Sequence, residues 1–211
     1  MHVKKFLPLA ALLPVLVMGA CGGDDDDDET PAVVPGTSTP VTTTSPTAQA
    51  TAVETAGSTP GGFSGSTNPV EAAPPAGVSQ PRLVAMRAAA QPGFDRLVFE
   101  FDGALVPGYK VAYGEAAVAC GSGSDLTDFI GGGKSPAALL LVDMRPAVGH
   151  DDAGQPTAPR DLQPSLSTLK RVVRTCDFEG VVGYGVGLSA RKPFAVSTLN
   201  NPPRLVIDIA Q

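Results

Sequence analysis

Residues 22–80 have the composition of a segment that does not fold on its own, which leaves only the rest of the chain to form a core. The segment begins with a run of six acidic residues, Asp24–Glu29, and continues as a tract of Thr, Pro, Ser, Ala, Gly and Val in which Phe63 is the only aromatic residue. Such a tract buries too little apolar surface to offset the entropy of ordering its backbone. We therefore expect residues 21–80 to be a disordered linker and residues 81–211 to be the folded domain.

Residues 1–20 have the features of a bacterial lipoprotein signal peptide. Two lysines precede an apolar segment, residues 6–17, and the sequence Met-Gly-Ala-Cys ends at Cys21, with small residues next to the expected cut. As a helix, the apolar segment would reach about 18 Å, which is short of the ~30 Å hydrocarbon core of a bilayer. We expect cleavage before Cys21, lipid on that cysteine, and a protein held on the membrane outside the cytoplasm. An ordinary signal peptide that happens to contain a cysteine is the alternative.

The charge of the chain is concentrated before the predicted domain. The formal net charge is −6, whereas the residues from 80 onward carry 13 acidic and 13 basic side chains. A neutral domain behind an acidic linker lacks the basic surface that nucleic acid requires, so nucleic acid is not an expected partner.

Alternation of apolar and polar residues predicts a mainly β fold. In residues 95–102, three apolar side chains point one way and mostly polar ones point the other way, as in a half-buried strand. A Pro-Gly turn at residues 91–93 joins this strand to the preceding one as a hairpin. Several short strands between Gly/Pro turns favour a β-sandwich, with strands near residues 82–87, 95–102, 109–113, 138–143, 181–188, 194–197 and 204–209.

One short α-helix is predicted after Pro164, a residue well suited to the first turn of a helix. Leu166, Leu169, Val172 and Val173 then recur at helical spacing. We expect this helix to pack on one of the sheets.

Two cysteines remain once Cys21 is set aside. Cys120 and Cys176 form an even pair in an oxidising compartment, which suggests a disulfide. Two free buried thiols are the alternative, since unpaired cysteine is often buried.

The sequence offers little for catalysis. His150 is the only histidine after the signal peptide, and no Gly-x-Ser-x-Gly motif is present. The tripeptide His150-Asp151-Asp152 either binds a cation or acts as an acid/base pair, or it is a solvated turn before a glycine. We expect no enzyme activity, no bound metal and no cofactor.

Glycines line one face of the predicted strand at residues 181–188. Gly183, Gly185 and Gly187 share that face, while Tyr184 lies on the other. A row of glycines leaves a shallow trough that another backbone or a ligand can approach. The trough is either filled by the helix or the facing sheet, or it is a groove for glycan or peptide.

The closing segment Pro203–Ile209 resembles the last strand of AMIN domains, β-sandwich modules that target peptidoglycan amidases and secretins to the cell wall. A longer set of motifs resembles the AMIN-like domain of bacterial envelope lipoproteins over residues 82–211. These motifs are Arg96–Phe101, Pro107–Val111, Gly121–Gly123, Pro146–Asp151, Asp177–Gly180 and Gly183–Leu188.

The resemblance implies a non-catalytic module that binds the cell wall. We take Arg204, Tyr184, Glu179 and His150 as candidate ligand contacts, although Arg204 and Glu179 also suit ion pairs at strand edges. The alternative function is a protein-interaction module that docks an envelope complex through an exposed strand edge. A metal-dependent hydrolase centred on His150 is a third hypothesis.

Overall fold

A computed structural model describes residues 63–211 of the chain. The predicted signal peptide, Cys21 and the acidic run lie outside the described residues. Within them, ten strands form two sheets whose pairings between named strands are all antiparallel. A single turn of helix completes the regular structure of this part of the chain. The predicted mainly β sandwich with one short helix is therefore confirmed.

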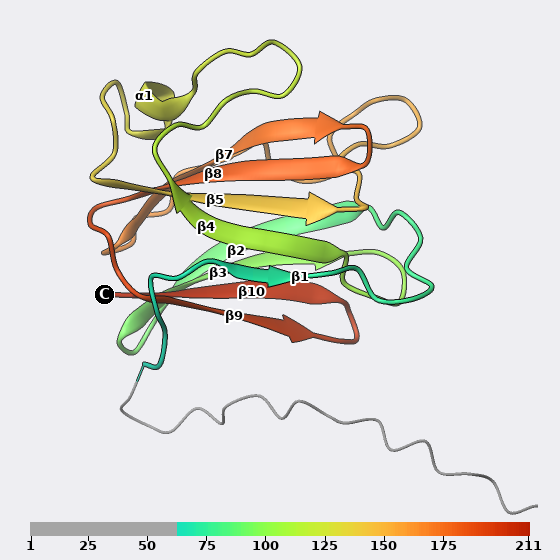
Figure 1. Cartoon of the computed structure of the whole chain (residues 1–211), viewed down its shortest axis with the longest axis horizontal. Coiled ribbons are helices and arrows are strands. Elements are labelled where there is room, and N and C mark those ends of the chain that lie inside the picture. Colours follow the sequence, from blue (N-terminus) through green and yellow to red (C-terminus); the bar gives the residue numbers. More distant parts are fainter. Residues whose placement is uncertain (1–62) are drawn as a thin grey trace, which may run out of the picture. The chain divides into compact units, whose positions relative to one another are not determined.

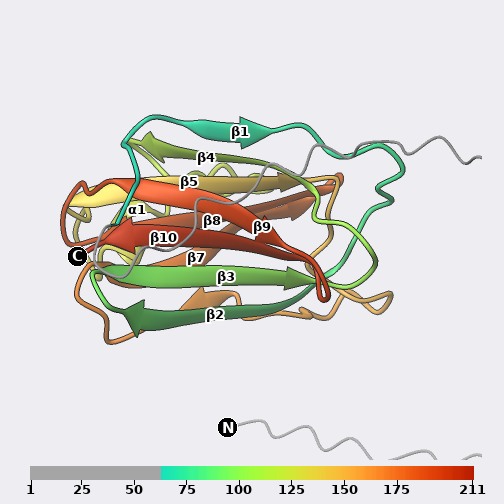
Figure 2. The same ribbon diagram turned by 90° about the horizontal axis from the view of Figure 1, so that it is seen from below.

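The larger sheet has six strands in the order β1-β4-β5-β8-β7-β6, and the smaller has four in the order β2-β3-β10-β9. Figure 1 shows the two layers, and Figure 2 views them from the side of the smaller sheet. The strands of the larger sheet are β1 (Val70–Ala72), β4 (Gly108–Gly114), β5 (Ala138–Arg145), β6 (Asp161–Leu162), β7 (Leu169–Phe178) and β8 (Val181–Leu188). Those of the smaller sheet are β2 (Leu83–Gln91), β3 (Phe94–Phe101), β9 (Phe194–Leu199) and β10 (Arg204–Ala210).

The main core lies between the two sheets. Alternate residues of each strand point inward, as the period-two pattern requires. Phe99 of β3 and Tyr184 of β8 meet there with ring centroids 5.1 Å apart. The aliphatic side chains around them are fully buried, among them Leu97, Leu140, Val142, Val186, Leu205 and Ile207.

The predicted helix after Pro164 was wrong, because the residues from Leu169 onward form strand β7. The pairing of β7 with β8 shifts between Leu169 and Arg171, which marks a β-bulge at Lys170. A bulge adds one residue to the strand, so inward side chains on its two sides are three apart instead of two. Leu169 and Val172 are both fully buried for this reason, and their spacing imitates a helix.

The observed helix, α1 (Thr127–Ile130), lies in the long connection between β4 and β5. This connection covers the outer face of the larger sheet (Figure 1). Ile130 is buried in a second, smaller core with Ala117, Leu139 and Val173.

Ile130 fills the glycine trough on β8 at Gly185 and Gly187, while Thr175 and Cys176 of β7 lie next to Gly183. A Cβ added to Gly185 would lie 2.5 Å from Cδ1 of Ile130, and one added to Gly187 would lie 2.8 Å from its Cγ2. The packing interpretation of the trough is therefore correct, and the groove for glycan or peptide on these glycines was wrong. The side chain that fills the trough comes from α1 and not from the helix that the sequence predicted.

The disulfide between Cys120 and Cys176 is present and ties the β4–β5 connection to β7. This confirms the predicted pair and excludes the alternative of two free thiols. The backbone N–H of Cys120 also donates a hydrogen bond to the carbonyl of Thr175 at 3.0 Å.

The folded part begins earlier than residue 81. Val70–Ala72, which the sequence analysis placed in the disordered linker, pairs with Tyr109–Val111 of β4. Ser66 exchanges two backbone hydrogen bonds with Phe194, at 3.0 and 2.8 Å, and Phe63 lies 6.0 Å from Phe94 between ring centroids. The linker prediction is thus wrong for these residues, which are ordered because they pair with residues far along the chain.

Over residues 63–211, we find no helix with the length and apolar character needed to cross a membrane.

Candidate binding site

The most organised polar cluster lies at the end of the sandwich where β7 passes into β8. Asp177 stands at its centre with only 14% of its side chain exposed. Its Oδ1 accepts a hydrogen bond from the N–H of Gly149 at 2.8 Å, and Nδ1 of His150 lies 3.0 Å from the same oxygen. Its Oδ2 lies 2.9 Å from Nη1 of Arg174, which in turn donates to the carbonyl of Gly149 at 2.8 Å. One carboxylate and one guanidinium therefore fix the loop that carries His150.

His150 is held by one edge of its ring and open at the other. Because an ionised carboxylate only accepts hydrogen bonds, the contact with Asp177 assigns the proton to Nδ1 and leaves Nε2 as a possible acceptor. The side chain is 40% exposed. His150 can therefore present a fixed polar group to a ligand outside.

Asp151 and Asp152 make different contacts. Oδ1 of Asp151 accepts hydrogen bonds from the N–H groups of Ala153 and Gln155, at 3.0 and 2.7 Å, and so closes a turn. Asp152 is fully exposed and lies 3.3 Å from Nη2 of Arg82. The turn interpretation of this segment is correct.

A pocket of about 450 Å³ opens in front of this loop. It is lined by Gln80, Arg82, Val148, His150 and the turn that follows. The strand-like contact between Arg82 and Val148 brings the two sides of the pocket together. In the described chain, no three His, Cys, Asp or Glu side chains gather closely enough to hold a metal ion.

The turn between β7 and β8 lies beside this pocket. Glu179 and Gly180 both have positive φ angles, 48° and 76°, as in the tight turns that join antiparallel strands. Gly180 accepts a hydrogen bond from Ala147 at 2.9 Å, and a Cβ on it would lie 3.2 Å from Nε2 of Gln80. The predicted contact residues Glu179 and His150 therefore share one end of the molecule.

Phe178 is a surface residue that the sequence analysis missed. It precedes the turn and is 61% exposed, the most of any large apolar side chain in the described residues. The sequence signal for an exposed Phe178 was its position directly before a two-residue turn. At the end of a strand, a side chain that points away from both cores has nothing to pack against. An exposed aromatic face is a suitable surface for a sugar ring. We name the exposed surface formed by Gln80, Arg82, His150, Asp152, Phe178 and Glu179 the His150 end.

Tyr184 is not a surface contact, and this candidate was wrong. The residue is 1% exposed, and its hydroxyl donates to the carbonyl of Pro159 at 3.1 Å. Burial raises the pKa of the phenol well above its ordinary value, against the nearby positive charge of Arg174. The period-two pattern placed Tyr184 on the correct face, but that face is the core.

Arg204 lies on the outer face of the smaller sheet, at the first position of β10. Its Nε donates to the carbonyl of Pro202 at 3.2 Å. Glu100 stands directly across from it on β3 but is bound by Arg87 at 2.6 Å. The neighbouring Pro203 accepts a backbone hydrogen bond from Phe101, and Asp102 donates one to Arg82 of the His150 end. The Arg204 side chain itself takes no part in these contacts, so we do not count it in the cluster.

The sandwich, its end loops and the disulfide define a small β module with one preorganised polar end. A family model for the AMIN-like domain matches residues 81–211, and the chain therefore belongs to the AMIN-like domain family. Membership suggests a module that binds peptidoglycan or a partner protein. No curated protein and no solved structure matches the chain.

Proposed function

We propose that this protein is a lipid-anchored lipoprotein of the bacterial cell envelope whose AMIN-like domain binds peptidoglycan without catalysis. The contact surface in this proposal is the His150 end. Cys21 carries the lipid, and the residues up to about 62 serve as a tether between membrane and domain.

The observation that carries the proposal is the fixed His150 loop and its pocket, at an end of the molecule where the β7–β8 turn also exposes Phe178. Asp177 and Arg174 hold His150 in place before any ligand arrives, so little conformational entropy is lost on binding. Phe178 offers an apolar face, and Gln80 and Arg82 offer hydrogen-bond donors. A glycan presents the matching groups, namely apolar ring faces and hydroxyl and carbonyl acceptors.

Co-sedimentation with purified peptidoglycan sacculi tests this proposal. The protein is the chain from residue 22, which lacks the lipid site but keeps every described residue. We expect saturable pelleting that persists at high salt, because stacking and neutral hydrogen bonds are screened little. Phe178→Ala and His150→Ala should each weaken binding about tenfold, which corresponds to about 1.4 kcal/mol.

Arg191→Gln is the matched control, because Arg191 is exposed and packs over Tyr113 away from the His150 end. It should pellet like the unaltered chain. If the double variant Phe178→Ala/His150→Ala pellets as well as the control, the His150 end is not the contact surface. If the unaltered chain does not pellet, peptidoglycan is not the ligand.

The lipid anchor has its own test. After expression in a bacterial host, the full-length chain should partition into the detergent phase of a Triton X-114 extract. Cys21→Ser should move it to the aqueous phase. Equal partitioning of both proteins would rule out acylation at Cys21.

A protein partner is the second candidate, and the edge position of β2 favours it. Strand β2 is nine residues long and pairs with β3 on only one side in the described fold. A free strand edge is a ready site for an added strand. A photo-crosslinker at the exposed Ala90 should then trap a partner in intact cells, whereas the same group at Lys110 should not.

A further inference from the structure

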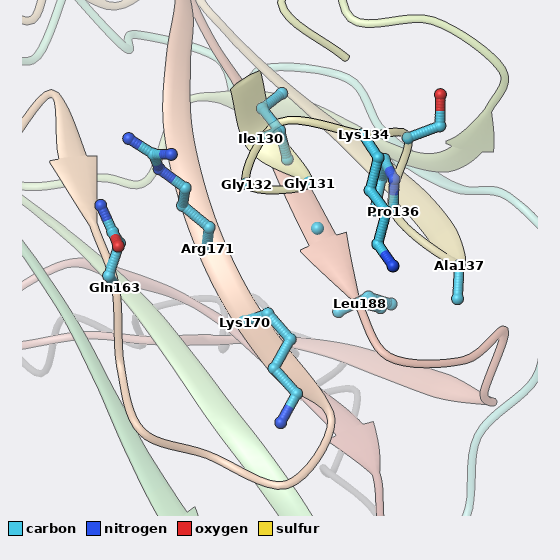
Figure 3. A pocket seen from close by; sticks show the side chains of 12 residues that line it. Ile130, Gly131, Gly132, Lys134, Pro136, Ala137, Gln163, Lys170, Arg171 and Leu188 are labelled. Atoms are coloured by element: carbon cyan, nitrogen blue, oxygen red, sulfur yellow. The ribbon is translucent and has the colours of Figure 1, made fainter. Parts of the chain in front are cut away.

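A second pocket lies on the outer face of the larger sheet and shares no lining residue with the pocket at His150. It has a volume of about 240 Å³ and lies between strands β7 and β8 and residues 130–137, which are the end of α1 and the loop after it. Figure 3 shows the loop residues Lys134 and Pro136 on one side and Lys170 and Arg171 of β7 on the other. The proposed function does not use this pocket, and of its lining only Gly187 belongs to the glycine face that the sequence analysis considered.

Part of the surface inside the pocket is apolar, and the rest is polar or charged. Gly187 and Leu188 of β8 contribute to it, with Ile130, Pro136 and Ala137 from the loop. The lining contains no aromatic residue. The space therefore suits small apolar groups such as methyl groups, and it offers no ring on which a sugar or a base would stack.

The loop wall depends on three consecutive glycines. A Cβ on Gly131 would collide with the backbone oxygen of Lys134, and Gly132 and Gly133 have φ angles of 77° and 102°. Their N–H groups already donate to the carbonyls of Thr127, Phe129 and Asp128. A phosphate-binding loop requires free N–H groups aimed at the ligand, and these three are occupied.

The charged groups at the pocket are positive. Lys134 has no carboxylate within ion-pair distance among the described residues, and neither has Lys170, whose Nζ donates once to the carbonyl of Leu166 at 2.6 Å. An ammonium group has three donors, so Lys170 keeps two for a ligand. The bulge at Lys170 explains its position, because it places Lys170 and Arg171 on the same outer side of β7.

The guanidinium of Arg171 is already bound by groups of the protein and holds the loop in place. It pairs with Asp161, donates to the carbonyl of Phe129 at 2.7 Å and stacks 3.8 Å from the Phe129 ring centroid. Asp128, the nearest acidic residue of the loop, accepts the hydroxyl of Ser135 at 2.8 Å. The loop wall is thus fixed before binding, and the two lysines remain as free cations.

We propose that this pocket binds the terminal carboxylate of a short peptide whose last residues carry methyl side chains. Lys134 and Lys170 hold the carboxylate, and the apolar lining receives the methyl groups. The stem peptides of peptidoglycan end in this way, in D-alanine, so the inference rests on the proposed wall-binding function and names a second contact for it. Point charges on flexible stems suit a carboxylate, while the absence of free N–H groups in the glycine run disfavours phosphate.

The test uses the chain from residue 22 and the probe N-acetyl-D-alanyl-D-alanine. The matched ligand is the same dipeptide with a C-terminal amide, which differs only in the negative charge. In a titration followed by amide NMR shifts, we expect saturable changes at Gly131, Gly187 and Leu188 with the acid. The amide should bind at least tenfold more weakly.

Lys134→Gln/Lys170→Gln is the decisive variant, since both residues are exposed and neither forms an ion pair among the described residues. It should bind the acid at least tenfold more weakly with an unchanged unfolding midpoint. Lys110→Gln is the control, because Lys110 is an exposed lysine on β4 that lies 3.9 Å from Glu71. This variant should bind like the unaltered chain.

Several results would overturn the inference. The first two are equal binding of acid and amide, and NMR shifts confined to other residues. The other two are tighter binding of inorganic phosphate than of the dipeptide, and no binding up to about 10 mM dipeptide, which means a binding free energy weaker than about 3 kcal/mol. Sacculus pelleting is measured in parallel. Pelleting without dipeptide binding removes this pocket but leaves the proposed function intact, whereas dipeptide binding without pelleting supports the pocket and removes wall binding.

Discussion

Arg174 and Asp177 are three residues apart in one strand, and yet Nη1 of the first lies 2.9 Å from Oδ2 of the second. In a regular strand, side chains three apart point to opposite faces. The pairing of β7 with β8 shifts between Arg174 and Cys176, and this second bulge turns both side chains to the same side. The extra residue in the strand therefore creates the ion pair that fixes the His150 loop.

Removing the carboxylate of Asp177 should destabilise the protein strongly. In Asp177→Ala, the guanidinium of Arg174, only 7% exposed, loses its charged partner. A buried charge left without a partner costs about 3 kcal/mol or more. Urea unfolding followed by circular dichroism measures the loss. Asp152→Ala is the control, since Asp152 is fully exposed, and its unfolding midpoint should not move; equal midpoints for both variants would contradict the assigned role.

Reduction of the disulfide should lower stability by a predictable amount. Cys120 and Cys176 are 56 residues apart in sequence, and closing a loop of that length removes about 4 kcal/mol of unfolded-state entropy on the chain-entropy model. Dithiothreitol should therefore lower the urea midpoint of the unaltered chain. Dithiothreitol should not change the urea midpoint of Cys120→Ser/Cys176→Ser. If it does not change the midpoint of the unaltered chain either, the prediction is refuted.

A methyl group in the glycine trough should push α1 away from the sheet. A Cβ at position 187 would lie 2.8 Å from Cγ2 of Ile130 and 3.1 Å from its backbone oxygen, so Gly187→Ala should cost about 1–3 kcal/mol. Gly121→Ala is the matched control, because nothing lies within 4 Å of its added Cβ. The cost of Gly187→Ala should fall in an Ile130→Ala background, since the colliding side chain is then absent. An equal cost in both backgrounds would show that Ile130 is not the obstacle.

Stability should fall in acid because of Asp95, a fully buried residue at the start of β3. Burial alone would raise the pKa of its carboxyl, but hydrogen bonds from the N–H groups of Leu169 and Thr168 and from the Gln211 and Ser167 side chains lower it below the ordinary 3.8. A carboxyl with a lowered pKa in the folded state stabilises the fold above its unfolded-state pKa. That stabilisation is lost as the pH falls through the folded-state pKa.

Urea unfolding between about pH 2 and pH 6 measures this dependence. The unaltered chain should lose stability below about pH 4, while Asp95→Asn should be less stable at neutral pH and lose less on acidification. Parallel curves for the two proteins would assign the acid sensitivity to other groups. Asp161, which pairs with Arg171 and also has a lowered pKa, is the first of these.

The sequence predicted the strands well where the two-residue alternation is unbroken. The hairpin of β2 and β3 and the strands β4, β5, β8, β9 and β10 all fall near their predicted positions. Strand β7 was missed because its first bulge spaces Leu169 and Val172 like successive turns of a helix. Strand β1 was missed because its order comes from pairing with β4, which is distant in sequence and invisible in local composition.

Of the four candidate contacts that the sequence suggested, the structure brings two together. His150 and Glu179 lie at one end of the molecule, but Tyr184 is in the core and Arg204 is on another face. Two-residue alternation divides a strand into two faces without saying which one is buried, and this explains the error at Tyr184. Phe178 and the pair Lys134 and Lys170 were missed, because a bulge or a loop brings each of them to its place.

The way in which the chain enters the fold has a mechanical consequence. A pull applied from the N-terminal side first meets the two hydrogen bonds between Ser66 and Phe194, and then the three-residue pairing of β1 with β4. These bonds lie at the margin of the sandwich and open one after another, whereas the core strands behind them would have to separate together. Residues 63–72 can therefore detach under tension while Gln80, Arg82 and the strands from β2 onward stay in place.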